Sequence, residues 1–459
     1  MASIAIIGGG PAGYVAAITA AQQGQEVTII DQGPLGGTCL NEGCMPTKSL
    51  LESAEIYSKV KHAGDFGIRL PSGQLEIDWN AVLFRKNNIV STLVQGIQYL
   101  MRKNKVKVIK GAGSFVTDRV LRIDTGGKQV EVTADKVIIA AGSEPIPLPF
   151  APFDGNWIIH SSQAMSLPSI PSSLLIVGGG VIGCEFASIY SRLGTKVTIV
   201  EMADQLLPGE DEDVALILHK QLDSDGVTIY PSTALKELNS ELKSAYFENK
   251  NGLHEVQADY VLVSIGRKPR VNHLGLEKIG IDFSRKGINV NHQMQTNIPN
   301  IYACGDITGG IQLAHVAFHE GAVAALNACE RESQVNYRAV PRCIYTSPEI
   351  AGVGLTEKQA REQYGDIRVG EFPFSANGKA LIANEVNGKV KVLIEPLFGE
   401  ILGISIVGAH ATELIAQGTI MLHAELTTET MENFIAAHPS LSEAVHEALL
   451  SAVDHAVHV

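Results

Sequence analysis

The sequence has few cysteines, few aromatic residues, and neither a long apolar run nor a basic one. Six cysteines in 459 residues do not form a secreted disulfide framework, so we expect a reducing compartment, the cytoplasm. No apolar stretch reaches membrane-spanning length, and the chain enters its first predicted strand at residue 4, which leaves no room for a leader segment. With 36 basic and 49 acidic residues, the net charge of −13 argues against nucleic acid and anionic membranes as partners.

Two of the cysteines, Cys39 and Cys44, lie close together just after a glycine-rich turn. A disulfide between them would close too short a loop to stabilise a domain. A regular helix would separate them by about 7.5 Å, beyond the roughly 4.4–6.8 Å that a disulfide allows, so a bonded pair needs a distorted turn. Gly43 and Pro46 suit such a turn. The spacing leaves two interpretations open, a redox pair or two buried thiols. No metal site is predicted, because no second cysteine pair and no histidine pair has zinc spacing.

One pattern occurs twice: a strand, a glycine-rich turn, a helix, and a second strand that ends on an acid. The first copy begins at residue 4 and ends at Asp31, and the second begins at residue 174 and ends at Glu201. The glycines of the turns are Gly8, Gly10 and Gly13 in the first copy and Gly178, Gly180 and Gly183 in the second. A lone GxGxxG is weak, but this context predicts a dinucleotide site, with the pyrophosphate at the helix N-terminus and the acid on a ribose.

The two halves also end alike, since residues 137–145 resemble residues 261–269. In each, a buried strand breaks at a glycine, Gly142 or Gly266, and then at a proline, where we expect the chain to cross between domains. Residues 202–210, which follow Glu201, contain no Lys or Arg to bind a 2′-phosphate. The second site is therefore predicted to prefer NAD to NADP.

These motifs, with segments 296–306 and 438–443, resemble the flavin disulfide reductases in order and over essentially the whole length. The resemblance implies an α/β fold with two Rossmann-like dinucleotide-binding domains and a C-terminal α+β dimerisation domain. It places the first part of the FAD-binding domain at 1–146, the NAD-binding domain at 147–271, the second FAD/central part at 272–340, and the interface domain at 341–459. It also implies a homodimer.

Within this family the chain is most similar to the enzymes that oxidise protein-bound dihydrolipoamide. Their partners are the lipoyl domains and the acyltransferase core of a 2-oxo acid dehydrogenase complex. Glutathione and mercuric reductases are the alternatives. The first group normally uses NADP, and the second needs a C-terminal cysteine pair, whereas no cysteine follows Cys343.

The resemblance implies one tightly bound FAD per subunit, and NAD. The residues implied for FAD are Gly8, Gly10, Gly13, Asp31, Gly37, Thr38, Lys48, Gly113, Gly142, Asp306 and Ala314. Those implied for NAD are Gly178, Gly180, Gly183, Glu185, Glu201 and Gly266. Lys48 and Glu185 correspond to an ion pair beside the reactive flavin nitrogen, where a cation stabilises negative charge on reduced flavin. One departure is Asp31, where glutamate is usual.

The catalytic residues implied are Cys39, Cys44, His438 and Glu443. A thiol needs a base near neutral pH, and His438 is the candidate because an acid, Glu443, follows it at a helix start and would fix its tautomer. In this family the base comes from the partner subunit. Ser440 or Ser442 is expected to cap that helix. The remaining cysteines are expected to be small buried hydrophobes, and His455 and His458 to lie at the surface.

Overall fold

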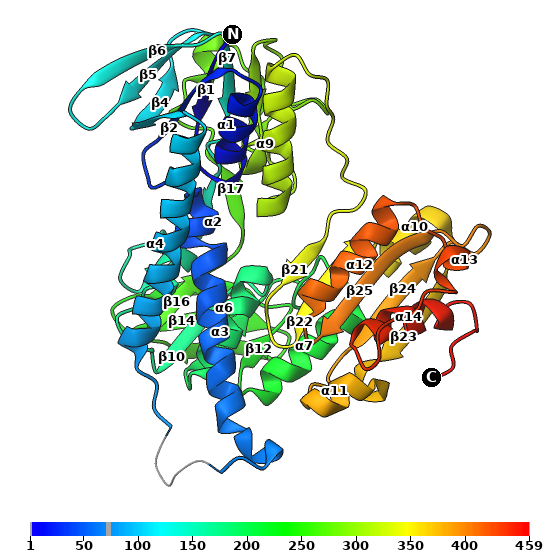
Figure 1. Cartoon of the computed structure of the whole chain (residues 1–459). Coiled ribbons are helices and arrows are strands. Elements are labelled where there is room, and N and C mark those ends of the chain that lie inside the picture. The colour runs from blue at the N-terminus through cyan, green and yellow to red at the C-terminus, as the bar shows by residue number, and fades with distance from the viewer. Residues whose placement is uncertain (1, 70–74, 459) are drawn as a thin grey trace.

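A computed structural model describes residues 2–69 and 75–458, so Met1 and Val459, at the ends of the predicted domains, lie outside the described residues. The structure is mixed α/β, and Figure 1 shows a first parallel sheet, a second one below it, and a separate C-terminal sheet beside the second. Among the described residues, no helix combines the length and the apolar character needed to cross a membrane.

The first sheet is parallel, in the order β20-β7-β1-β2-β3. Its strands are β1 (Ser3–Ile7), β2 (Glu26–Asp31), β3 (Lys107–Lys110), β7 (Lys136–Ile139) and β20 (Ile301–Ala303). The central strands are apolar runs with both faces covered, as parallel sheets require. Helix α1 (Pro11–Gln22) packs on α9 (Ala314–Ala328). The contact is close because α9 carries Gly321, where a Cβ would lie 2.3 Å from the carbonyl oxygen of Ala12.

The second sheet repeats this plan in the order β12-β11-β10-β16-β9. Its strands are β9 (Ile158–Ile159), β10 (Ser173–Val177), β11 (Lys196–Val200), β12 (Thr228–Tyr230) and β16 (Tyr260–Val263), with helices α5 (Ser161–Ala164), α6 (Val181–Arg192) and α7 (Glu212–Ser224). A three-stranded antiparallel sheet comes just before the equivalent strands β7 and β16 in the two halves. These are β4 (Ala112–Phe115), β5 (Val120–Asp124) and β6 (Gln129–Thr133), and β13 (Ala234–Asn239), β14 (Ser244–Asn249) and β15 (Gly252–Gln257). The repeat therefore extends well beyond the glycine turns.

The two predicted crossing segments lie side by side. Strand β8 (Ser143–Pro145) pairs antiparallel with β17 (Arg267–Pro269), so the chain leaves the first half and re-enters it through one two-stranded ribbon. After β17 come α8 (Leu276–Ile279), β18 (Phe283–Ser284) and β19 (Gly287–Ile288), and then β20 joins the first sheet. The exact domain boundaries at 146, 271 and 340 stay predictions.

The helices that carry the cysteine segment connect the two halves. Helix α2 (Gly37–Glu42) is followed by α3 (Cys44–Lys61), the 3₁₀ turn η1 (Ala63–Phe66) and the long α4 (Trp79–Lys103). Figure 1 shows α3 and α4 side by side, and α3 also packs against α6 of the second half. The cysteine segment thus starts at the first sheet and extends onto the second.

The C-terminal sheet is antiparallel, in the order β21-β22-β25-β24-β23. Its strands are β21 (Arg342–Ile344), β22 (Glu349–Gly354), β23 (Arg368–Pro373), β24 (Lys389–Ile394) and β25 (Ile401–Gly408). Its helices are α10 (Glu357–Tyr364), α11 (Gly378–Ala383), α12 (Ala411–His423), α13 (Thr428–Met431) and α14 (Ser442–Ser451), and the 3₁₀ turns elsewhere are η2 (Gly305–Thr308) and η3 (Phe374–Ala376). Ile344, Ile350 and Val407 of this sheet belong to the same core as the second sheet, so the two are packed together.

The expected cap of α14 is wrong. Neither Ser440 nor Ser442 caps the helix, because the N-cap position is Leu441. The Ser440 backbone N–H instead donates to Glu443, and the Ser442 hydroxyl accepts a hydrogen bond from Gln417. A serine side chain satisfies helix N–H groups only from the N-cap position, and here each serine is one residue away from it.

Candidate functional site

Both glycine turns open onto one cavity of about 2690 Å³. Most predicted site residues line it, namely Gly8, Gly10, Asp31, Gly37, Thr38, Cys39, Cys44, Lys48, Gly113, Gly142, Gly178, Gly180, Glu185, Glu201, Gly266, Asp306 and Ala314. A pocket for one drug-sized ligand is about 300–1,000 Å³, so this cavity has room for two dinucleotides.

The third glycine of each turn does not line the cavity, and its role is packing. A Cβ at Gly13 would lie 1.9 Å from the Gly8 carbonyl oxygen, and one at Gly183 would lie 2.0 Å from that of Gly178. The middle glycines have more space. A Cβ at Gly180 would meet no atom within 4 Å, one at Gly10 would lie 3.7 Å from the Gly37 Cα, and no side chain caps the N-terminus of α1 or α6. This arrangement fits a pyrophosphate at each helix N-terminus.

The two strand-terminal acids make equivalent contacts despite their different lengths. The Asp31 carboxylate accepts hydrogen bonds from the N–H groups of Gly9 and, at 2.7 Å, Gly33. The Glu201 carboxylate accepts from Gly179 at 2.5 Å and from Ala203 at 2.6 Å. Aspartate in place of glutamate therefore keeps the link between the acid and its glycine turn.

Cys39 and Cys44 lie on either side of a break between two helices, so no regular helix runs through the pair; the distorted turn was predicted for a bonded pair, and here the thiols are free. Cys39 belongs to α2 and Cys44 is the first residue of α3, with Gly43 between the helices. A Cβ at Gly43 would come within 3.0 Å of the Thr38 carbonyl oxygen, so only glycine fits this break without displacement. Both thiols are free and half-buried, and they share a hydrogen bond.

The two thiols have opposite acidities. The hydrogen bond from Cys39, helped by the nearby Lys48 cation and opposed by burial, lowers the pKa of Cys44 to about 7. The same hydrogen bond, with burial, raises the pKa of Cys39 above its ordinary value. Cys44 is therefore the thiol that ionises first.

The predicted pair of Lys48 and Glu185 is in contact. The Lys48 Nζ lies 2.8 Å and 2.9 Å from the two carboxylate oxygens of Glu185, a side chain only 5% exposed. Tyr345 completes this group: its backbone N–H donates to Glu185 at 3.1 Å, and its ring centroid lies 4.5 Å from the Lys48 Nζ. Tyr345 was not predicted from the sequence, because no motif surrounds it.

A series of hydrogen bonds that was also not predicted links Asp306 to Ser143 and Arg267. The Ser143 hydroxyl donates to the Asp306 carboxylate at 2.5 Å, and Arg267 donates to the Ser143 hydroxyl and carbonyl, both at 2.8 Å. Burial lowers the pKa of Arg267, and the Asp306 carboxylate opposes that shift. Ser143 and Arg267 both stand in the matching segments 137–145 and 261–269, each directly after its glycine, and this was the available signal.

His438 and Glu443 are in contact with each other but do not line the cavity within one chain. The His438 Nδ1 lies 2.8 Å from Glu443, and the His438 side chain is 80% exposed. Although burial opposes it, hydrogen bonds from the Ser440 N–H and from His438 hold the pKa of Glu443 below its ordinary value. The pair is thus oriented as a base with a carboxylate behind it.

The other cysteines and histidines largely follow expectation. Cys184 and Cys304 are fully buried, Cys329 is partly buried, and Cys343 is partly buried but lines the cavity. His455 and His458 are exposed, although each pairs with a glutamate, Glu432 and Glu447 respectively. Within residues 2–69 and 75–458, no group of three or more His, Cys, Asp or Glu side chains is arranged to hold a metal ion.

Comparison with known proteins gives consistent matches. The family described as pyridine nucleotide-disulphide oxidoreductase matches residues 2–321, and its dimerisation domain matches residues 340–449. A dihydrolipoyl dehydrogenase of Bacillus subtilis (strain 168) is 58% identical over 457 residues, which cover 99% of this chain and 100% of the relative. A dihydrolipoyl dehydrogenase of Geobacillus stearothermophilus is 39% identical, covering 99% and 97%.

Two solved structures are similar over nearly the whole chain. LpdA of Mycobacterium tuberculosis has a TM-score of 0.91 at 30% identity, covering 98% of this chain and 99% of that one. The HOCl-induced flavoprotein disulfide reductase RclA of Escherichia coli has a TM-score of 0.86 at 28% identity, covering 97% and 99%.

Proposed function

The chain belongs to the pyridine nucleotide-disulphide oxidoreductase family, and from this we propose that it is a dihydrolipoyl dehydrogenase. Its reaction would oxidise protein-bound dihydrolipoamide to lipoamide and transfer two electrons through a Cys39–Cys44 disulfide and FAD to NAD⁺. One observation carries the proposal: a single cavity contains the cysteine pair, the Lys48–Glu185 pair and both dinucleotide turns. The full-length similarity to a dihydrolipoyl dehydrogenase supports the choice of dithiol.

The residues around the first glycine turn suit FAD. The N-terminus of α1 and the Gly36–Gly37 backbone would hold the pyrophosphate, with Asp31 near the adenosine ribose and Asp306 near the ribityl chain. Gly37 approaches Gly10 so closely that a Cβ on Gly37 would lie 2.5 Å from the Gly10 Cα. When bound, FAD supplies the two-electron carrier between the thiols and the nicotinamide. Lys48 would stabilise negative charge on the reduced carrier, and we assign Gly113, Gly142, Thr38 and Ala314 to the same cofactor.

The residues around the second turn suit NAD rather than NADP. Residues 202–210 contain no basic side chain, and Arg342, which reaches this loop, is paired with Glu210 at 2.9 Å and 3.2 Å. The Glu201 carboxylate would accept hydrogen bonds from the ribose hydroxyls of NAD and repel a 2′-phosphate. We therefore assign Gly178, Gly180, Glu201 and Gly266 to NAD, with Gly183 supporting the turn by close packing and Glu185 beside the nicotinamide.

The thiol chemistry follows from the acidities of the two cysteines. His438 accepts a proton from the dithiol, and the resulting thiolate attacks Cys39 Sγ of the oxidised pair. The Cys39–Cys44 bond breaks and Cys44 leaves as the thiolate, which is the better leaving group because its pKa is lower. The second substrate thiol then displaces Cys39, so the substrate closes to a disulfide and the pair holds the two electrons and one proton.

The base in this scheme comes from the partner subunit. Residues 340–449 match a dimerisation domain, and within one chain His438 is exposed and does not line the cavity. A homodimer would bring the partner's base to Cys39.

We further propose that lipoyl domains deliver the dithiol and that the acyltransferase core of a 2-oxo acid dehydrogenase complex is the docking partner. The enzyme would work in the cytoplasm, where reduced thiols persist.

A substrate panel tests the proposal. Purified enzyme is assayed with lipoamide, glutathione disulfide and Hg²⁺, each with NADH and with NADPH. We expect rapid lipoamide-dependent oxidation of NADH and little turnover in the other five combinations. Preference for glutathione disulfide or Hg²⁺ would replace the proposed function with one of its alternatives, and comparable rates with NADPH would contradict the NAD assignment.

A further inference from the structure

Tyr345 joins the C-terminal sheet to the ion pair beside the cysteines. It follows directly after strand β21 and reaches into the cavity that contains Lys48. The Lys48 Nζ lies 4.5 Å from the centre of its ring, inside the roughly 6 Å range of a cation–π contact. Its backbone N–H donates to the Glu185 carboxylate at 3.1 Å. One residue thus contacts both members of the pair.

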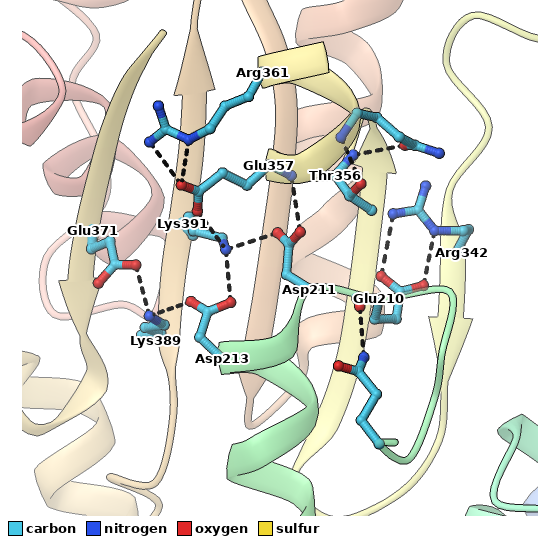
Figure 2. Close-up of polar contacts among 12 residues, drawn as sticks. Glu210, Asp211, Asp213, Arg342, Thr356, Glu357, Arg361, Glu371, Lys389 and Lys391 are labelled. Carbon is cyan, nitrogen blue, oxygen red and sulfur yellow. Dashed lines mark hydrogen bonds and ion pairs between the residues drawn. The ribbon is translucent and has the colours of Figure 1, made fainter. Parts of the chain in front are cut away.

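The backbone that carries Tyr345 is held on both sides. Ile344 and Thr346 are each 2% exposed, and Ile344 packs into the core shared with the second sheet. At the start of β21, Arg342 binds both carboxylate oxygens of Glu210 and donates to the Gly354 carbonyl at 3.1 Å. Figure 2 shows this bidentate pair at the junction between the loop before α7 and the C-terminal sheet. The ring of Tyr345 is therefore presented from a fixed position.

Lys48 is the more exposed member of the ion pair. Its side chain is 29% exposed, against 5% for Glu185, and it borders the cavity. The Tyr345 ring covers one side of the Lys48 ammonium. Lys48 is also a cation that stabilises the Cys44 thiolate, and the other charged or titratable groups acting on Cys44 are Cys39, Glu185 and Arg267.

We propose that Tyr345 is a positioning residue, whose ring holds the Lys48 ammonium beside Cys44 and so favours the Cys44 thiolate. The C-terminal sheet, which is otherwise concerned with dimerisation, thereby sets the reactivity of the cysteine pair. The inference rests on the proposed function, in which Cys44 leaves the disulfide as the thiolate. The test of this proposal measures the ionisation of Cys44 and needs no dithiol substrate. The role of Tyr345 can therefore be refuted without refuting the proposed function, and the reverse.

The experiment measures how the rate of Cys44 alkylation by iodoacetamide depends on pH. The parent protein is loaded with FAD and carries Cys39→Ser, which removes the second thiol but keeps a hydroxyl donor beside Cys44. Cys44 is identified by mass spectrometry. Tyr345→Leu removes the ring but keeps an apolar side chain. In Tyr345→Leu we expect the midpoint of the pH dependence of Cys44 alkylation to rise by about 0.5–1 pH unit, which slows alkylation at pH 6 by about three- to tenfold. Tyr345→Phe keeps the ring face and should retain the parent midpoint.

Tyr364→Leu is the matched control, because Tyr364 lines the same cavity from α10, and its midpoint should not move. If Tyr345→Leu does not fold, judged by its thermal transition, Tyr345→Met replaces it as a flexible variant without a ring. An unchanged midpoint in a folded variant without the ring would overturn the proposal. So would a Tyr345→Phe midpoint that rises as far as that of Tyr345→Leu, because the hydroxyl would then be the active group.

Discussion

The contacts of Lys391 allow a direct test of what holds the C-terminal sheet against the half of the molecule that contains the second parallel sheet. This lysine lies on β24 with a side chain 1% exposed, and its Nζ is 2.8 Å from Asp211, 2.8 Å from Asp213 and 3.3 Å from Glu357. Asp211 and Asp213 come from the start of α7, whereas Glu357 belongs to α10. Figure 2 shows these carboxylates converging on the single ammonium. Lys391→Met would leave three carboxylates together without their shared cation.

The expected loss is large because the ammonium and its partner Asp211 are buried, with side chains only 1% and 6% exposed. Removing one partner of a buried ion pair costs about 3–5 kcal/mol, since the remaining charge is left uncompensated. Lys389, two residues earlier on β24, provides the matched control. It contacts Asp213 at 2.6 Å and Glu371 at 2.7 Å, but it is 18% exposed and its carboxylate partners are more exposed still. Solvent screening reduces the expected loss for Lys389→Met to about 1 kcal/mol.

The assay is thermal unfolding of the two variants beside the parent, at pH 7 and equal protein concentration. At about 2–4 °C per kcal/mol for a domain of 150–250 residues, Lys391→Met should lower the midpoint by roughly 6–20 °C and Lys389→Met by a few degrees. Equal shifts in the two variants, or a stable Lys391→Met, would refute the reasoning that burial of the shared ammonium makes the cluster stabilising.

Four further predictions concern charge and chemistry. Working against burial, hydrogen bonds and charge from Lys389 and Lys391 lower the pKa of Asp213, and those from Arg361 and Lys391 lower the pKa of Glu357. The stability that these two carboxylates add is therefore present above about pH 4 and lost as the pH falls through their folded-state pKa values. The difference in free energy of unfolding between the parent and Lys391→Met should narrow in acid, and a constant difference would contradict this linkage. In the reduced protein, alkylation of Cys44 should show a midpoint near pH 7, whereas a midpoint above 9 would contradict the assignment of Cys44 as the more acidic thiol. His438→Gln should slow dithiol oxidation by at least about 100-fold and leave electron transfer from NADH to a dye nearly unchanged, and similar losses in both assays would remove the base role. Glu201→Ser combined with Met202→Arg should raise kcat/KM for NADPH by about tenfold or more relative to NADH, and an unchanged ratio would show that specificity is determined elsewhere.

Local patterns in the sequence predicted much of the site. The two glycine turns, their acids and the cysteine segment each occupy a short stretch whose residue types are dictated by backbone geometry. The contact between Lys48 and Glu185 was also expected, from the family resemblance, and it is present. The repeat itself indicated two dinucleotide-binding units of the same design, and the structure contains two parallel sheets with matching turns.

Contacts between distant segments were not predictable in the same way. Tyr345 stands in an ordinary strand end, and only the packing of β21 against the second half brings it to Lys48. Lys391 alternates with valines in β24, a pattern typical of a half-exposed strand, yet its solvent face is covered by α7 and α10. The break at Gly43 depends on the close approach of Thr38, which spacing alone cannot reveal.

The proposed function requires electrons to flow from a dithiol through Cys39 and Cys44. The most direct measurement compares dihydrolipoamide-dependent NAD⁺ reduction by the parent enzyme and by Cys44→Ser, with bound FAD quantified from its absorbance in both. We predict that Cys44→Ser retains its FAD but loses dithiol turnover. Normal reduction of NAD⁺ by an FAD-loaded Cys44→Ser enzyme would contradict the redox-pair assignment and the function built on it.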